Sequence, residues 1–231
     1  MLVAYKGLGG EVVIPDDEGI LYIGAYAFCL YTTDNSIEVT EDDYDKNKTP
    51  DGNMAVTKIV VPDGVEEIQK YAFYNCPALE SVVIPKSVRF IREYAFYNDV
   101  KLNSVDLENV ESIGAHAFDG CKNLLSANLT KAYADDREAF KNCASLESLN
   151  LSALRNTGDG AFRGTSGLTS VTLTGNTKLS KYMFAESGLN NVTIYNKGTV
   201  LPEYAFLNCK NLTSVTFSED LVEIGTAAFK G

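Results

Sequence analysis

Hydrophobic and polar residues alternate in short runs that recur along the chain roughly every 22 residues. The run that starts at Leu79 reads Leu-Glu-Ser-Val-Val-Ile, and the run that starts at Leu102 reads Leu-Asn-Ser-Val-Asp-Leu. A period of two indicates a strand with one buried face, because successive side chains point to opposite sides. The alternation therefore predicts short strands at 79–84, 102–107, 168–173, 189–194 and 212–217.

A phenylalanine, preceded by alanine in all but one copy, marks a second fixed position in the repeat. The series comprises Phe28, Phe73, Phe96, Phe118, Phe140, Phe162, Phe184, Phe206 and Phe229. After a first gap of 45 residues the intervals are 23, 22, 22, 22, 22, 22 and 23, so the register is kept throughout. A polar pair such as Asn-Cys or Gly-Cys follows many of these phenylalanines, which favours a single helical or 3₁₀ turn at this place.

One repeat cannot bury its own apolar side chains, but stacked repeats can, since each coil covers the equivalent residues of its neighbours. Equivalent strands should pair in parallel, and parallel crossover connections are nearly always right-handed. The sequence thus predicts an α/β, β-rich, right-handed solenoid with coils of 22–23 residues, extending over residues 1–231 as one domain.

The stretch Ile68–Pro85 follows the pattern Ile-x-x-x-Ala-Phe-x-x-Cys-x-x-Leu-x-Ser-Val-x-Ile-Pro and resembles the BspA-like class of bacterial leucine-rich repeats. The resemblance extends from about Gly10 to Gly231. It implies a curved solenoid whose parallel sheet lines the concave side. It also implies a cell-surface or secreted protein, because members of that family are mostly surface-exposed and several act as adhesins. Since the chain stops just after Phe229, we expect it to be a fragment of a longer polypeptide.

The long first gap contains one repeat that lacks its phenylalanine. Residues 31–56 are rich in carboxylates, and the apolar positions of a coil would there be Asp42, Asp45 and Pro50. Burying unpaired carboxylates is unfavourable by several kcal/mol each. The segment is therefore predicted to be a degenerate repeat or an acidic insertion that loops outward.

Metal-binding motifs are incomplete. Asp43-x-Asp45-x-Asn47 begins like a calcium loop, but Lys48 stands where glycine is required and Met54 where a glutamate belongs. No Cys-x-x-Cys pair is present to suggest a zinc site. The sequence therefore predicts neither a metal nor a cofactor.

Composition restricts the possible partners of this chain. The net charge is −11 over 231 residues, and no stretch gathers the lysines and arginines that a nucleic acid or an anionic membrane would require. No apolar run reaches the roughly 20 residues of a membrane-spanning helix. We therefore expect neither nucleic-acid binding nor membrane insertion.

Four of the five cysteines share one repeat position, three residues after the phenylalanine. They are Cys76, Cys121, Cys143 and Cys209. Other coils carry Asp99, Thr165 or Ser187 there. A position that accepts Cys, Thr or Ser favours a small residue with a weak hydrogen bond, so free buried thiols are expected in preference to disulfides. A bridge between Cys121 and Cys143, which lie in adjacent coils, remains the alternative.

Catalytic groups are scarce in this sequence. His116, the only histidine, occupies the repeat position that tyrosine holds in most coils, so we expect it to flank the surface as the tyrosines do. No serine or cysteine stands in a matching place for a catalytic triad. The sequence predicts no catalytic residues.

The polar residues between the inward-facing Leu, Val and Leu of each strand should form an outer face. We call this the strand face. Its candidate binding residues are Ser104, Asp106, Ser126, Asn128, Ser148, Asn150, Ser170, Thr172, Asn191, Thr193, Ser214 and Thr216. Such a surface could contact a host or matrix protein, or a glycan, through many weak polar contacts. The alternatives are a structural spacer that presents another domain and, less favoured, an enzyme.

Overall fold

The computed structural model describes residues 9–16, 19–30, 51–52, 55–132, 134–151, 154, 156–175, 177–196 and 198–231. The strands lie in two series, one on each of two sides of the coils. The first series consists of β1 (Gly10–Val13), β5 (Val56–Val60), β7 (Ser81–Val83), β9 (Ser104–Val105), β11 (Ser126–Asn128), β13 (Ser148–Asn150), β14 (Ser170–Gly175), β15 (Asn191–Asn196) and β17 (Ser214–Phe217). The second consists of β2 (Tyr22–Ile23), β6 (Glu67–Ile68), β8 (Phe90–Ile91), β10 (Ser112–Ile113), β12 (Ala134–Asp135), β16 (Thr199–Leu201) and β18 (Leu221–Ile224).

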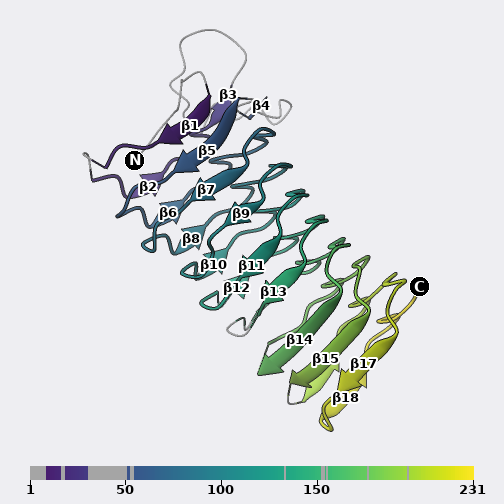
Figure 1. Cartoon of the computed structure of the whole chain (residues 1–231). Helices are drawn as coiled ribbons and strands as arrows, with labels where there is room; N and C mark the ends of the chain where they lie inside the picture. Colours follow the sequence, from purple (N-terminus) through teal and green to yellow (C-terminus); the bar gives the residue numbers. More distant parts are fainter. Residues whose placement is uncertain are drawn as a thin grey trace.

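The first series forms three parallel sheets, β1-β5-β7-β9, β11-β13 and β14-β15-β17, and the second forms two, β2-β6-β8-β10-β12 and β16-β18. Within each sheet, equivalent repeat positions of successive coils face each other. Val82 of β7 pairs with Val105 of β9, and Ile68 of β6 pairs with Ile91 of β8. The coils stack in sequence order, with β1 near one end of the stack and β17 near the other (Figure 1). The predicted parallel solenoid with one repeat per coil is confirmed.

The nine phenylalanines form one continuous file through the core. The ring centroids of successive members lie 4.9–5.7 Å apart from Phe28 to Phe229. All members except Phe229 are almost completely buried. This spacing is close to the distance of about 4.8 Å between parallel strands, so each coil contributes one ring to the file. The predicted register of the file is confirmed.

The third side of each coil consists of turns, which we call the turn edge. Around Ala-Phe the expected turn is an isolated one and not part of a helix among the described residues: the Tyr74 amide donates to the Tyr71 carbonyl at 3.1 Å, and from the Phe73 coil onward two residues of each segment adopt left-handed backbone angles. In one coil Tyr71 has φ 59° and Asn75 has φ 53°. A left-handed residue cannot continue a right-handed helix, so separate turns form instead.

No helix among the described residues is long and apolar enough to cross a membrane.

The coils on either side of the long first gap are direct neighbours. β1 pairs with β5, β2 pairs with β6, and the Phe28 ring lies 5.0 Å from the Phe73 ring. A short antiparallel pair, β3 (Cys29–Leu30) with β4 (Asp51–Gly52), joins the two ends of the intervening segment. Residues 31–50, on which the prediction of a degenerate repeat or a looped insertion largely falls, lie outside the described residues.

One coil is a residue shorter than the others between its phenylalanine and its strand, and a glycine makes the shorter connection possible. The spacing from Phe184 to Leu189 is five residues, whereas the other coils with this leucine have six. The shorter connection draws Gly188 against the preceding coil, where its amide donates to the carbonyl of Thr165 at 3.1 Å. A Cβ at Gly188 would overlap the carbonyl oxygen of Ser166. The absence of a side chain therefore permits this close approach.

Replacing Gly188 by alanine should lower the free energy of unfolding by about 1–2 kcal/mol, because the new methyl group forces the two coils apart. Chemical denaturation of the two proteins measures the difference. Gly198→Ala is the matched control, since a Cβ there meets nothing within 4 Å. The left-handed φ of 61° at Gly198 itself costs an alanine about 1–2 kcal/mol, so this variant measures backbone strain without overlap, whereas Gly188→Ala measures overlap without that strain. Unchanged stability of the Gly188→Ala variant would contradict the predicted overlap.

Candidate functional site: the strand face and the turn edge

The strand face is exposed and polar over most of its length. Apart from Thr193, which is partly exposed, the side chains of the candidate residues of strands β9 to β17 face solvent. Two neighbouring coils in the middle illustrate the order, since Ser126 pairs with Ser148 and Asn128 pairs with Asn150. Asp106 is the only charged member of the candidate set. The face thus presents two columns of hydroxyl and amide groups that can donate and accept hydrogen bonds.

The same columns continue across the last three strands of the first series. Ser170, Asn191 and Ser214 are successive register partners, and Thr172, Thr193 and Thr216 form the second column. Adjacent parallel strands lie about 4.8 Å apart, so equivalent groups recur at that interval along the stack. A ligand with a repeating polar structure could therefore contact several coils at once.

The cysteines are free thiols, and four of the five are buried, as predicted. Each thiol hydrogen of Cys121, Cys143 and Cys209 is donated to the phenylalanine carbonyl of the preceding coil, at 3.0–3.2 Å. Burial raises the pKa values of Cys121 and Cys143 well above the ordinary thiol range. A thiol that stays protonated is a poor nucleophile, so these cysteines serve packing.

Asp99 is the exception in this column of small residues. Its side chain is completely buried, and its Oδ1 accepts the amide hydrogen of Cys76 at 2.6 Å. Oδ2 has no hydrogen-bond partner among the described residues. Burial raises the pKa of Asp99 well above its ordinary value. Burying a carboxyl group with an unpaired oxygen is unfavourable, so Asp99 lowers the stability of the folded protein.

His116 lies inside the turn edge, and the expectation that it flanks the surface is wrong. Its side chain is 11% exposed. The Tyr94 ring stacks on the imidazole with a centroid distance of 4.8 Å, and Asp119 and Glu138 approach its edge. These neighbours cover the ring because stacking places equivalent positions of adjacent coils in contact.

Three metal-binding side chains meet at this place. His116 Nδ1 lies 3.1 Å from Asp119 Oδ2 and 3.4 Å from Glu138 Oε2. The three ligand atoms all lie within 4.8 Å of one another. Sequence reasoning missed this cluster. The available signal was that His116 and Glu138 both stand two residues before a phenylalanine, in adjacent coils.

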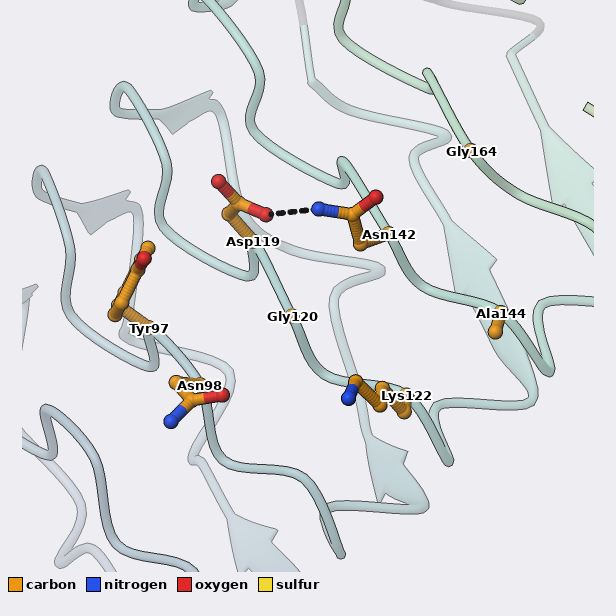
Figure 2. A pocket seen from close by; sticks show the side chains of 8 residues that line it. All are labelled: Tyr97, Asn98, Asp119, Gly120, Lys122, Asn142, Ala144 and Gly164. Carbon is orange, nitrogen blue, oxygen red and sulfur yellow. Dashed lines mark hydrogen bonds between the residues drawn. The ribbon is translucent and has the colours of Figure 1, made fainter. Parts of the chain in front are cut away.

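An open depression of about 420 Å³ lies beside the cluster on the turn edge (Figure 2). Asp119 belongs both to the cluster and to the lining of the depression. Its Oδ1 accepts a hydrogen bond from Asn142 Nδ2, another lining residue, at 3.2 Å. The lining residues are Tyr97, Asn98, Asp119, Gly120, Lys122, Asn142, Ala144 and Gly164. Most of them are small or polar, so the depression favours water, ions or short polar groups over an apolar ligand.

Solved structures of leucine-rich-repeat proteins resemble this fold. A leucine-rich-repeat protein from T. pallidum is 25% identical, with a TM-score of 0.50, and the match covers 73% of this chain and 72% of that chain. One from Eubacterium ventriosum is 18% identical, with a TM-score of 0.52, over 77% of this chain and 68% of that chain. Comparison with curated protein sequences finds no match.

A family model agrees with the repeat and with the coil geometry. The model of the BspA type leucine rich repeat region matches residues 51–151 and 134–231, with 6 copies of the repeat. The matched regions include the phenylalanine file from Phe73 onward and the polar columns of the strand face. The chain therefore belongs to the BspA-type leucine-rich-repeat family.

Proposed function

We propose that this chain is a non-catalytic binding module of a bacterial cell-surface or secreted protein, which attaches to a host or matrix protein or to a glycan. The observation that carries the proposal is the strand face, where exposed Ser, Thr and Asn side chains recur at equivalent positions and are in register within the sheets β11-β13 and β14-β15-β17. Members of this family are mostly surface-exposed, and several act as adhesins. The buried, protonated thiols described above offer no nucleophile that would favour an enzyme.

The composition of the strand face favours an extended partner. High-affinity protein interfaces usually depend on a few aromatic or arginine anchors, and the candidate residues include none. Binding would instead sum weak polar contacts over several coils, so the affinity should depend on the length of the ligand. A linear glycan or an extended polypeptide fits this requirement better than a compact small molecule.

Labelled protein should bind a subset of a combined array of glycans and extracellular-matrix proteins. The double variant Ser170→Glu/Thr172→Glu should weaken each positive signal by roughly tenfold or more. The bound ligand would cover the two new carboxylates and leave them without partners of opposite charge. Both positions are exposed, so stability should change by less than about 0.5 kcal/mol.

The matched control is Lys210→Glu, which places a new carboxylate at an exposed position outside the strand face. This variant should bind like the unaltered protein. If the control and the double variant lose binding equally, the strand face is not the contact surface. If the unaltered protein binds nothing on the array, the spacer role is favoured instead.

A further inference from the structure

We propose that His116, Asp119 and Glu138 form a three-ligand site for a divalent transition-metal ion of the Zn²⁺ type, independent of the strand face. Imidazole nitrogen with two carboxylate oxygens is a donor set that zinc accepts, with a fourth position left for water. Residues that ligate through nitrogen and oxygen but not sulfur also suit Co²⁺ and Ni²⁺, and Zn²⁺ or Cu²⁺ would bind more tightly than Mn²⁺.

The distances between the donor atoms fit one shared ion. Bonds of about 2.0–2.1 Å arranged tetrahedrally place neighbouring donors about 3.3 Å apart. The observed separations are 3.1 Å from His116 Nδ1 to Asp119 Oδ2 and 3.4 Å to Glu138 Oε2. The two carboxylate oxygens lie within 4.8 Å of each other, so a small rotation of one side chain completes the set.

The backbone holds these side chains in place through the stacking of coils. His116 has φ 56° and Glu138 has φ 55°, the left-handed conformation that tyrosine adopts at this position in other coils. Because equivalent positions are neighbours in the stack, histidine and glutamate must face each other here. Asp119 stands one residue after Phe118, where two earlier coils carry the stacked pair Tyr74 and Tyr97. The cluster thus replaces aromatic contacts with metal-binding groups.

Neighbouring groups orient the ligands as the outer shell of a metal site does. The Tyr94 ring lies parallel to the imidazole, with an interplanar angle of 8°. Asn142 donates to the second oxygen of Asp119, which leaves Oδ2 directed at His116. The side chains of His116 and Asp119 are only 11% and 8% exposed, so the site is shielded while the adjoining depression gives access.

Lys141 is the main competitor for the ion. Its Nζ lies 2.7 Å from Glu138 Oε2, the same oxygen that faces His116. A cation must displace Lys141, so removing that amine should strengthen binding.

The test uses EDTA-treated protein of the full 231 residues, titrated with ZnCl₂. Because His116 is the only histidine, long-range ¹H–¹⁵N spectra report its ring nitrogens without ambiguity. The Nδ1 resonance should shift and saturate at one equivalent, and the midpoint of thermal unfolding should rise as ZnCl₂ is added.

Two variants separate metal binding from a simple ion pair. His116→Tyr restores the residue found at this position in other coils, so it should fold, yet its zinc affinity should fall about 100-fold or more. Lys141→Gln should raise the affinity roughly three- to tenfold, an effect that a purely structural cluster would not show.

Two controls account for other zinc ligands. Cys29→Ser removes the least buried thiol, and Glu147→Gln removes an exposed carboxylate elsewhere; both should bind zinc like the unaltered protein. The proposal fails if ZnCl₂ leaves the His116 nitrogens unmoved. It fails equally if the affinity of His116→Tyr stays within about threefold of the unaltered protein.

Discussion

Replacing Phe162 by alanine is expected to lower the free energy of unfolding by about 3–5 kcal/mol, the range measured for a buried aromatic ring replaced by a methyl group. The Phe162 side chain is completely buried, and its ring lies 5.5 Å from both Phe140 and Phe184. Its loss leaves a cavity that neither neighbour can fill, because each is held by its own coil. Urea or guanidinium denaturation followed by circular dichroism measures the change.

Phe229→Ala is the matched control for this prediction. Phe229 is the last member of the file, is 36% exposed, and has Phe206 at 5.4 Å as its only neighbour within the file. Its replacement should therefore have a clearly smaller effect. Equal losses in the two variants would mean that the interior of the file is no better packed than its end. That result would contradict a continuous core.

Replacing Asp99 by asparagine is expected to stabilise the protein by about 2 kcal/mol or more at pH 8, since a buried carboxyl with an unpaired oxygen is unfavourable. Asparagine keeps an oxygen that can accept the Cys76 amide hydrogen, now 2.6 Å from Asp99 Oδ1, but carries no charge. Most other coils have a neutral residue in this column, so the site accepts an uncharged side chain.

The sign of the pH dependence follows from the raised pKa of Asp99. A folded-state pKa above the unfolded value of about 3.9 means that the folded protein binds the proton more tightly. The resulting stability is fully present below the unfolded-state pKa and is lost as the pH rises through the folded-state pKa. The advantage of Asp99→Asn should therefore be small near pH 4 and large at pH 8.

Denaturation curves at several pH values test this dependence. Asp106→Asn, at an exposed position, is the control and should change the pH profile little. An Asp99→Asn advantage that stays constant between pH 4 and pH 8 would show that burial of the carboxyl does not determine the effect. Destabilisation at pH 8 would contradict the account of Asp99 outright.

The features that sequence reasoning predicted correctly depend on position within the repeat. The phenylalanine file, the parallel strands and the free buried thiols all follow from counting residues between equivalent positions. Stacking converts a repeat position directly into a column. A residue type that recurs at one position must therefore meet its own copies above and below it.

The features that were missed depend on contacts between different positions or on backbone conformation. Tyrosine rarely adopts a left-handed φ, so nothing in the composition of the Tyr94 column indicated one. The stacking of the rings and the cross-coil hydrogen bonds hold it there. The turn around Ala-Phe was predicted from the polar residues that follow it, and the left-handed residues on either side restrict it to an isolated turn.

The cluster around His116 required knowledge of which columns are adjacent across the turn edge. Asp119 stands three residues after His116, and Glu138 stands 22 residues after it. Neither spacing indicates the site by itself, because the ligands come from two coils whose relative position only the folded solenoid defines. The strand face, by contrast, could be predicted because it requires only the alternation of side chains within each single strand.

A crystal structure of the chain would test the central claim most directly, since the solenoid, the strand face and the metal site all depend on coils stacked in register. We predict that the rings of Phe96, Phe118, Phe140 and Phe162 will form one file with successive centroids 5.0–5.5 Å apart. Finding these four rings in separate environments would contradict the stacked coils and everything inferred from them.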